Sequence, residues 1–155
     1  MQSVRRYSIQ LSYRGADFCG WQIQPDAPSV QQALVGRHDF RCFEKSGADS
    51  KTSICTVTAA AWHRYTPVHL SLTGRDGGDD YWYFRISADR FLRNMVRAIV
   101  GTLLEVGRGK RGEEGFRALV LPPDSAFADS PAGALRSRAG ESVPGHALFL
   151  NEIRY

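Results

Sequence analysis

The sequence lacks the features of several large classes of protein. No hydrophobic run approaches the roughly 20 residues that a membrane-spanning helix needs, and the polar start MQSVRRYS has no apolar centre like that of a signal peptide. The cysteines are odd in number and show no CxxC spacing, which argues against a disulfide framework or a zinc site: Cys19, Cys42 and Cys55. The four histidines lie far apart, so no metal is expected. We therefore expect a soluble protein of the reducing cytoplasm.

Positive charge is modest overall but concentrated in one stretch. The chain has 155 residues, 43% of them hydrophobic, which is enough for one compact domain with a buried core. Lysine and arginine outnumber aspartate and glutamate by 20 to 16. Residues 89–111 contain six basic residues against Asp89 and Glu105, and this excess of four equals the formal net charge of the chain, +4. Such a cluster favours a polyanionic partner, although basicity alone also fits many ordinary enzymes.

The stretch Ser87–Arg111 is the clearest helix in the sequence. Its apolar residues recur at spacings of three and four, as on one buried helical face: Phe91, Met95, Val96, Ile99, Val100, Leu103 and Leu104. Ser87 or Asp89 can cap the first turn, and Gly107 can adopt the left-handed conformation that ends a helix. The helix would carry three basic residues on one stripe: Arg90, Arg93 and Arg97. We expect it to pack against a sheet.

The rest of the chain shows strand patterns and shorter helices. Five segments have the period-two alternation or the β-branched content of strands: residues 7–13, 52–62, 68–73, 81–87 and 147–155. The last strand is expected to be partly buried on both faces, and Asp76–Gly78 is a turn signal. A second helix is expected from Glu113 to Leu121, and residues 36–49 suggest a short helical turn and a loop. A helix starting at VQQAL stops after about one turn, which is unusually short.

Four sequence blocks occur in a specific order. They are the opening strand with DFCGWQIQPDAPSVQQAL, then GRHDFRCF, then FLRNMVRAIVGTLLEVGRG, and finally SRAGESVPGHALFLNEIRY. Together they cover most of the chain and resemble the tRNA pseudouridine synthase A (TruA) family. The resemblance implies an α+β fold in which a mixed, mostly antiparallel sheet is flanked by helices around a basic cleft, usually in a homodimer. It also implies cofactor-free isomerisation of uridines 38–40 in the anticodon arm of tRNA to pseudouridine.

The sequence departs from the family pattern between the first and second blocks. The family places its catalytic aspartate in a GRTDxGVH motif downstream of the SVQ helix and later has an RRYRY-like strand, and neither motif is present. Residues 35–40, VGRHDF, match a family segment that normally lies far beyond both motifs. We therefore infer that an internal segment is missing near Leu34. Residues 1–34 would then be the start of the N-terminal, catalytic half, and residues 35–155 the C-terminal half.

Arg97 is the strongest candidate for a residue of the reaction site. A carboxylate nucleophile in a largely apolar pocket needs a nearby cation to stay ionised, and arginine offers a planar, permanently charged partner. By resemblance, Arg97 in the MVR sequence is the arginine that pairs with the family aspartate, and Arg93 is the second candidate. Without the resemblance, both arginines would be interpreted as solvated helix residues.

Other residues are candidates for substrate binding. Leu148 and Phe149, in PGHALFL, match the family segment that lines the pocket wall, although ordinary strand packing explains them equally well. Three cations after the long helix are candidate contacts to tRNA phosphates: Arg108, Lys110 and Arg111. Cross-strand packing explains a run of three aromatic residues better than stacking on RNA bases does: Tyr81, Trp82 and Tyr83.

Two acidic residues in the matched blocks are not expected to be the nucleophile. Asp17 lies in the turn before Gly20, and Asp39 is expected to brace the turn before Phe40. Because no carboxylate corresponds to the family nucleophile, the chain as written is not expected to make pseudouridine. The leading hypothesis is a tRNA pseudouridine synthase represented by an incomplete chain. The alternatives are a non-catalytic RNA-binding remnant of that fold and a basic scaffold protein without an RNA role.

Overall fold

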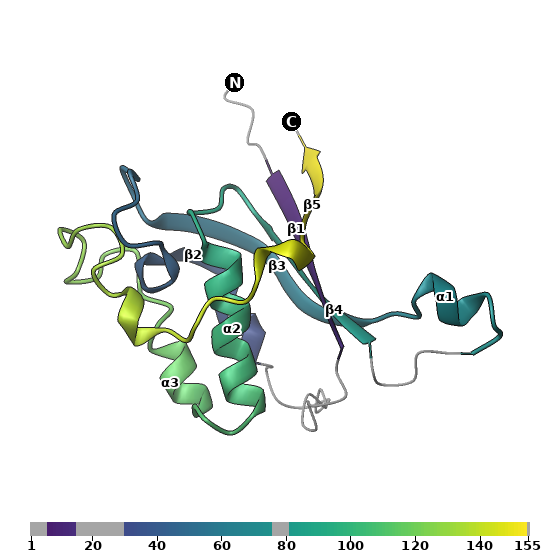
Figure 1. The fold of residues 1–155 in the computed structure, drawn as a ribbon. Helices are drawn as coiled ribbons and strands as arrows, with labels where there is room; N and C mark the ends of the chain where they lie inside the picture. Colours follow the sequence, from purple (N-terminus) through teal and green to yellow (C-terminus); the bar gives the residue numbers. More distant parts are fainter. Residues whose placement is uncertain (1–5, 15–29, 76–80, 155) are drawn as a thin grey trace.

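The computed structural model describes residues 6–14, 30–75 and 81–154, and its centre is a five-stranded sheet (Figure 1). The strands, in chain order, are β1 (Arg6–Arg14), β2 (Gly36–Asp39), β3 (Ile54–Arg64), β4 (Tyr81–Ala88) and β5 (Leu148–Arg154). In space they follow the order β2-β3-β4-β1-β5, and each neighbouring pair is antiparallel. With the helices given below, this confirms the α+β fold, and the described sheet is antiparallel throughout.

One long helix lies across a face of this sheet (Figure 1). It is α2 (Met95–Gly107), and the shorter α3 (Glu113–Arg117) follows it in the chain. The remaining helical segments are single turns: η2 (Val30–Leu34), η3 (Arg41–Phe43), α1 (Val68–Ser71), η4 (Arg136–Arg138) and η5 (Gly145–Ala147). The α1 turn projects from the far end of β3 and β4, away from α2 (Figure 1).

The hydrophobic core lies between the sheet and α2. Phe84 and Ile86 of β4 are fully buried, and so are Met95, Ile99 and Leu103 of α2. Burying an aliphatic or aromatic side chain stabilises a fold by about 1.5–3 kcal/mol relative to leaving it exposed, so this stripe is a main source of stability. The spacing of apolar residues in the sequence therefore predicted the buried face of the helix correctly.

The helix begins later than the sequence predicted. We expected helical structure from residue 87, but β4 continues through Ala88, which pairs with Val57 of β3. Asp89 then bonds to the same strand: its backbone N–H donates to the Thr56 carbonyl over 3.0 Å, and its carboxylate accepts from the Thr56 N–H over 2.8 Å. Asp89, which we expected to cap the helix, therefore ends the pairing of β4 with β3. Consequently, Arg90 and Arg93 precede α2 and share no helical stripe with Arg97.

The strand expected at residues 68–73 is wrong. Val68, Leu70 and Leu72 alternate with polar residues, yet this segment forms α1 and the turn that follows it. The side chains of Val68 and Leu72 are 74% and 82% exposed. Alternation of apolar residues predicts a strand only where one face can be buried, and this projecting segment packs against no core.

Two other boundaries also differ from expectation. The helix expected at residues 113–121 ends at Arg117, because the backbone of Leu121 instead pairs with Asp39 in an isolated bridge. Residues 36–49 contain a strand, β2, in addition to the expected helical turn, because Gly36–Asp39 can pair with β3. That pairing joins segments far apart in the chain, and a strand of four residues is too short to show a periodic pattern in the sequence.

The glycine with a left-handed backbone after α2 is Gly109, with φ of 70°, rather than Gly107.

The final strand is more exposed than expected. Strand β5 lies at the edge of the sheet and pairs only with β1 among the described strands. Phe149 is 57% exposed, Leu150 59% and Ile153 39%. An apolar sequence thus forms an edge strand with little cover, and the prediction that both faces are partly buried is wrong.

Three features named from the sequence lie outside the described residues. They are the turn at Asp76–Gly78, Asp17 and Cys19. Among the helices that are described, none is both long enough and apolar enough to cross a membrane.

Candidate functional site

A cavity of about 530 Å³ opens at the start of α2. It forms where the turn before this helix meets the helix's first turn, Lys45 in the loop after η3, and the first residue of β5. Its walls combine three basic side chains with an amide and five apolar side chains: Lys45, Arg93, Arg97, Asn94, Phe91, Leu92, Met95, Val96 and Leu148. Three of the residues selected from the sequence, Arg93, Arg97 and Leu148, therefore line one cavity.

Arg97 is held in place by the segment that precedes β5. Its Nε donates a hydrogen bond of 2.7 Å to the Val143 carbonyl. In the opposite direction, the Val143 N–H donates to the Arg97 carbonyl over 3.2 Å. A β-carbon on Gly145 would lie 3.6 Å from the guanidinium carbon, so this glycine is in close reach of the arginine head group. Among the described residues, no carboxylate forms an ion pair with Arg97.

The other two cations of the cavity are exposed, and a backbone hydrogen bond joins their residues. Lys45 and Arg93 are exposed, and the Lys45 N–H donates to the Arg93 carbonyl over 3.0 Å. The amino end of α2, which carries the positive end of the helix dipole, opens on the same cavity. Among the residues that the structure describes, no acidic side chain lines it. The site is therefore complementary to an anion next to an apolar group.

Leu148 and Phe149 do not act as a pair. In the register of the sheet, Leu148 is opposite Leu11 and Phe149 is opposite Gln10. Because successive residues of a strand point to opposite faces, Leu148 lies on the face that carries α2 and lines the cavity. Phe149 lies on the opposite face and is more than half exposed.

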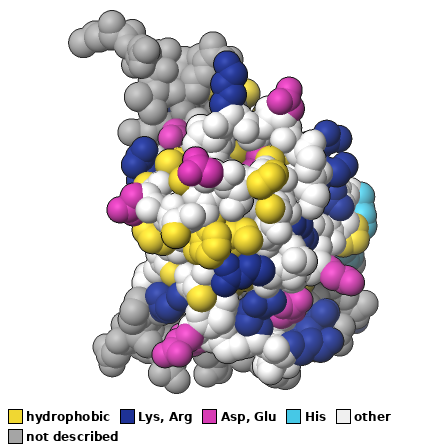
Figure 2. Space-filling model, turned by 90° about the vertical axis from the view of Figure 1, so that its left-hand side faces the viewer, with side chains coloured by type: hydrophobic (Ala, Val, Ile, Leu, Met, Phe, Trp, Pro, Cys, Tyr) yellow, Lys and Arg dark blue, Asp and Glu magenta, His cyan; other side chains and the backbone are white. Residues whose placement is uncertain are grey.

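The cationic cluster after α2 is separate from the cavity. Arg108 lies 11 residues beyond Arg97, which at about 1.5 Å per helical residue places its backbone roughly 16 Å away. Arg108 and Lys110 are exposed, whereas Arg111 forms a 2.9 Å ion pair with Glu105. On the face shown in Figure 2, basic side chains lie scattered among acidic and hydrophobic ones rather than in one continuous patch.

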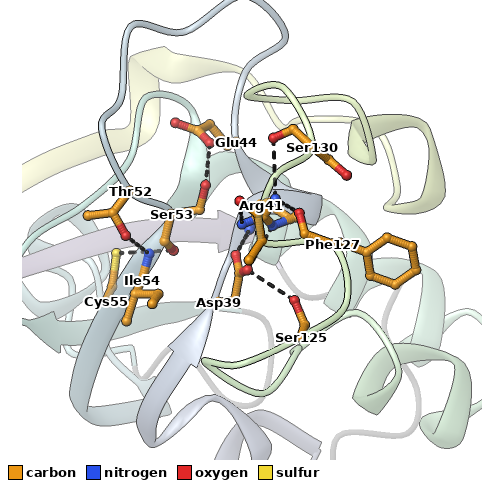
Figure 3. Close-up of polar contacts among 11 residues, drawn as sticks. Asp39, Arg41, Glu44, Thr52, Ser53, Ile54, Cys55, Ser125, Phe127 and Ser130 are labelled. Atoms are coloured by element: carbon orange, nitrogen blue, oxygen red, sulfur yellow. Dashed lines mark hydrogen bonds and ion pairs between the residues drawn. The ribbon is translucent and has the colours of Figure 1, made fainter.

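Asp39 is part of a buried structural cluster (Figure 3). Its carboxylate accepts from the Arg41 backbone N–H over 3.1 Å, from the Arg41 Nε over 2.7 Å and from the Ser125 hydroxyl over 3.3 Å. The guanidinium of Arg41 also donates to the carbonyls of Phe127, Ala128 and Ser130. Asp39 was expected to brace the turn before Phe40; it ends strand β2 and instead braces the helical turn η3 that follows Phe40, and it does not line the cavity.

Sequence reasoning missed four residues around the cavity. Lys45 and Asn94 line it, and Ser142 and Val143 support it from behind. Asn94 has a left-handed backbone, with φ of 69°, a conformation that asparagine tolerates better than most residues. The tolerance of asparagine for this conformation is the one feature of the sequence that could have drawn attention to Asn94, because its hydrogen-bond partner Ser142 lies 48 residues away in the chain.

The described residues contain no group of three or more histidine, cysteine, aspartate or glutamate side chains that could hold a metal ion.

The two described cysteines, Cys42 and Cys55, are free thiols buried in the core. Burial raises the pKa of Cys55 to about 12 and raises that of Cys42 as well, so both stay protonated near neutral pH. Neither lines the cavity.

Comparison with known proteins identifies similar sequences over most of the chain. A family model described as tRNA pseudouridine synthase matches residues 30–155. A protein of Bacteroides thetaiotaomicron named tRNA pseudouridine synthase A is 48% identical over 117 residues, which are 76% of this chain and 36% of that protein. A protein of the same name from Porphyromonas gingivalis is 44% identical over 145 residues, or 93% of this chain and 46% of its own length. The chain thus spans less than half the length of these relatives.

Proposed function

Because the chain belongs to the tRNA pseudouridine synthase family, we propose that it forms part of an enzyme that isomerises uridines 38–40 in the anticodon arm of tRNA to pseudouridine. The single observation that carries this proposal is the cavity at the start of α2, into which the family-matched Arg97, Arg93 and Leu148 converge. The family match covers the residues that build this cavity.

The reaction needs a carboxylate nucleophile, and this chain lacks the family motif that would supply it. In the isomerisation, the bond between ribose C1′ and uracil N1 breaks and a bond from C1′ to C5 forms, while a proton leaves C5 and N1 gains one. A carboxylate nucleophile starts this exchange in the family, and neither the GRTDxGVH motif nor an equivalent is present here. In our proposal Arg97 faces that carboxylate, and Arg93 and Lys45 add positive potential at the cavity mouth.

The lack of the catalytic aspartate motif agrees with our proposed division of the chain, in which a segment is absent near Leu34. Residues 1–34 represent the start of the catalytic half and residues 35–155 the C-terminal half, with a segment absent near Leu34. The match of the family model begins at residue 30, close to this boundary, and supports the division. The chain's share of its relatives, 36% and 46%, is also consistent with an absent segment.

The remaining cations suit the backbone of a bound tRNA. A uridine in a stem must be extruded before its ring can be reached, and Leu148 offers an apolar wall for the extruded base. Arg108, Lys110 and Arg111, roughly 16 Å further along α2, are placed to contact phosphates of the stem. We further propose that the enzyme is cytoplasmic, works without a cofactor and is a homodimer, as the family resemblance implies.

The experiment compares the 155-residue chain with a version in which the family's central segment is restored. Both are purified, their masses are confirmed, and release of label from uridine C5 of an anticodon-arm RNA is measured. We expect no release from the short chain and steady release from the restored form, abolished by Arg97→Ala. Release by the short chain would contradict the inferred gap, and release by neither form would contradict the proposed activity.

The same assay separates the enzyme from its alternative. A non-catalytic RNA-binding remnant would bind the anticodon-arm RNA in both forms and release label in neither. No observation on the structure favours this alternative, because the cavity keeps the family-matched arginine oriented by a backbone carbonyl.

A further inference from the structure

The segment from Gly140 to Gly145 runs along α2 as a strap. Its first residue donates a backbone hydrogen bond of 2.9 Å to the Thr102 hydroxyl, which in turn donates to the Ala98 carbonyl over 2.7 Å. Next to it, a β-carbon on Gly101 would lie 1.7 Å from the Glu141 carbonyl oxygen. The strap can therefore approach the helix this closely only because residue 101 has no side chain.

Near its C-terminal end, the strap contacts Arg97 of α2. Its Val143 both donates to the Arg97 carbonyl and accepts from the Arg97 Nε, at 3.2 Å and 2.7 Å. The backbone bond holds the strap against the helix at Arg97, and the Nε bond fixes the direction of the guanidinium, whose two terminal nitrogens remain for other partners. The position of the Val143 carbonyl thus decides where Arg97 points within the cavity.

Ser142, the residue before this carbonyl, joins three separate parts of the chain. Its hydroxyl oxygen accepts a 2.6 Å hydrogen bond from the side-chain amide of Asn94 and a 2.8 Å bond from the guanidinium of Arg136. Asn94 belongs to the turn that lines the cavity, and Arg136 belongs to η4. One oxygen therefore connects the strap, the turn before α2 and the nearby helical turn η4.

Both donors to Ser142 would be costly to leave without a partner. Asn94 has a left-handed backbone, which is unfavourable for a residue with a side chain and persists only where its surroundings hold it. Arg136 is half-buried, and partial burial lowers its pKa while Glu105 acts in the opposite direction. A hydrogen bond from a charged donor is stronger than one between neutral groups.

We propose that Ser142 is a positioning residue for Arg97: by receiving hydrogen bonds from Asn94 and Arg136, it fixes the strap so that the Val143 carbonyl orients the Arg97 guanidinium toward the cavity. The proposal rests on the assignment of Arg97 to the reaction site. It concerns the orientation of that side chain and requires no contact between Ser142 and the RNA.

The test uses the 155-residue chain and the NMR signal of the Arg97 Nε–H, assigned by its loss in Arg97→Lys. The rate at which this proton exchanges with water reports on the bond to Val143. In Ser142→Ala we expect exchange to be about fivefold to tenfold faster, the factor that corresponds to the loss of one net hydrogen bond. Ser142→Thr retains the hydroxyl and should restore the parent rate.

Matched controls separate positioning from general loss of structure. Ser137→Ala removes an exposed hydroxyl five residues earlier and should leave the exchange rate unchanged. Asn94→Gly keeps a residue suited to the left-handed backbone and removes only the amide donor, so it should accelerate exchange as Ser142→Ala does. This second variant tests the proposal even if Ser142→Ala fails to fold.

An unchanged exchange rate in Ser142→Ala or Asn94→Gly would overturn the proposal, and so would a failure of Ser142→Thr to restore it. Because the measurement uses no RNA, it gives a result whether or not the chain binds tRNA. Absence of tRNA binding together with the expected exchange rates would therefore count against the proposed function and leave the orientation of Arg97 by Ser142 established.

Discussion

Two arginines of this molecule are held by backbone carbonyls, and they differ in what else they contact. Arg41 has its own carboxylate, Asp39, at 2.7 Å and donates to three carbonyls of residues 127–130 (Figure 3). Arg97 has one carbonyl, that of Val143, no carboxylate among the described residues, and a cavity in front of it. The guanidinium of Arg41 donates to groups of the fold from all three of its nitrogens, whereas the hydrogen bond of Arg97 to Val143 uses only Nε and leaves the two terminal nitrogens for a bound partner. This difference separates an arginine that stabilises the fold from one that can bind a substrate.

The largest effect is expected where the structural pair is broken. Asp39→Ala leaves the Arg41 guanidinium, which is 6% exposed, without its carboxylate. Removing one partner of a buried ion pair costs about 3–5 kcal/mol, so we expect the free energy of unfolding, measured by urea denaturation, to fall by that amount. A loss below about 1 kcal/mol would mean that the pair behaves as a surface pair, and the contrast with Arg97 would fail.

A smaller loss of stability is expected where the strap meets α2. In Gly101→Ala the added methyl group collides with the Glu141 carbonyl, so the strap has to move. Overpacking of this kind costs about 1–3 kcal/mol. The displaced strap should also release the Arg97 Nε–H, which would exchange faster with water. Gly115→Ala is the control, since a β-carbon there meets only the flexible Arg111 side chain, at 3.4 Å.

Arg97→Ala should have a still smaller effect on stability. It removes one hydrogen bond at the edge of a cavity and leaves the Val143 carbonyl open to water, so the expected loss is at most about 1 kcal/mol. In the form with the restored central segment, the same substitution should abolish label release. A stability loss as large as that of Asp39→Ala would show that Arg97 is structural after all.

The smallest effect on stability is expected after α2. Replacing Arg108, Lys110 and Arg111 together by alanine should leave the melting temperature nearly unchanged, because Arg108 and Lys110 are exposed and the ion pair of Arg111 with Glu105 is partly exposed to solvent. Affinity for tRNA should fall, and the slope of log affinity against log salt should flatten by roughly one unit for each phosphate contact removed. An unchanged slope would place the RNA on another surface.

The parts of this structure that could be predicted from sequence depend on local periodicity. The buried face of α2 follows from its apolar spacing, and β3 and β4 follow from their alternation. The predicted start of α2 was wrong because two hydrogen bonds between Asp89 and Thr56, one between backbone groups and one to the Asp89 carboxylate, extend the sheet where the local pattern still favours a helix.

The site was predictable only in part. Arg93, Arg97 and Leu148 were selected through resemblance to a family, and the structure places all three around one cavity. Their roles in binding and reaction remain predictions. The contact between Ser142 and Asn94 spans 48 residues and joins two common polar side chains. No spacing, composition or motif marks such a pair, because only the folded chain brings it together.

The position of β1 between β4 and β5 has a consequence for how the sheet forms. This strand, residues 6–14, pairs on one side with β4 and on the other with β5, and both partners lie far along the chain from it. Neither partner exists when β1 leaves the ribosome, so its backbone groups stay without strand partners until most of the chain has been translated. Pairing at such large sequence separation is slow, since closing long loops costs entropy before contacts form. We therefore expect the pairing of β1 with β4 and β5 to be a late step of folding, after the local helical turns have formed.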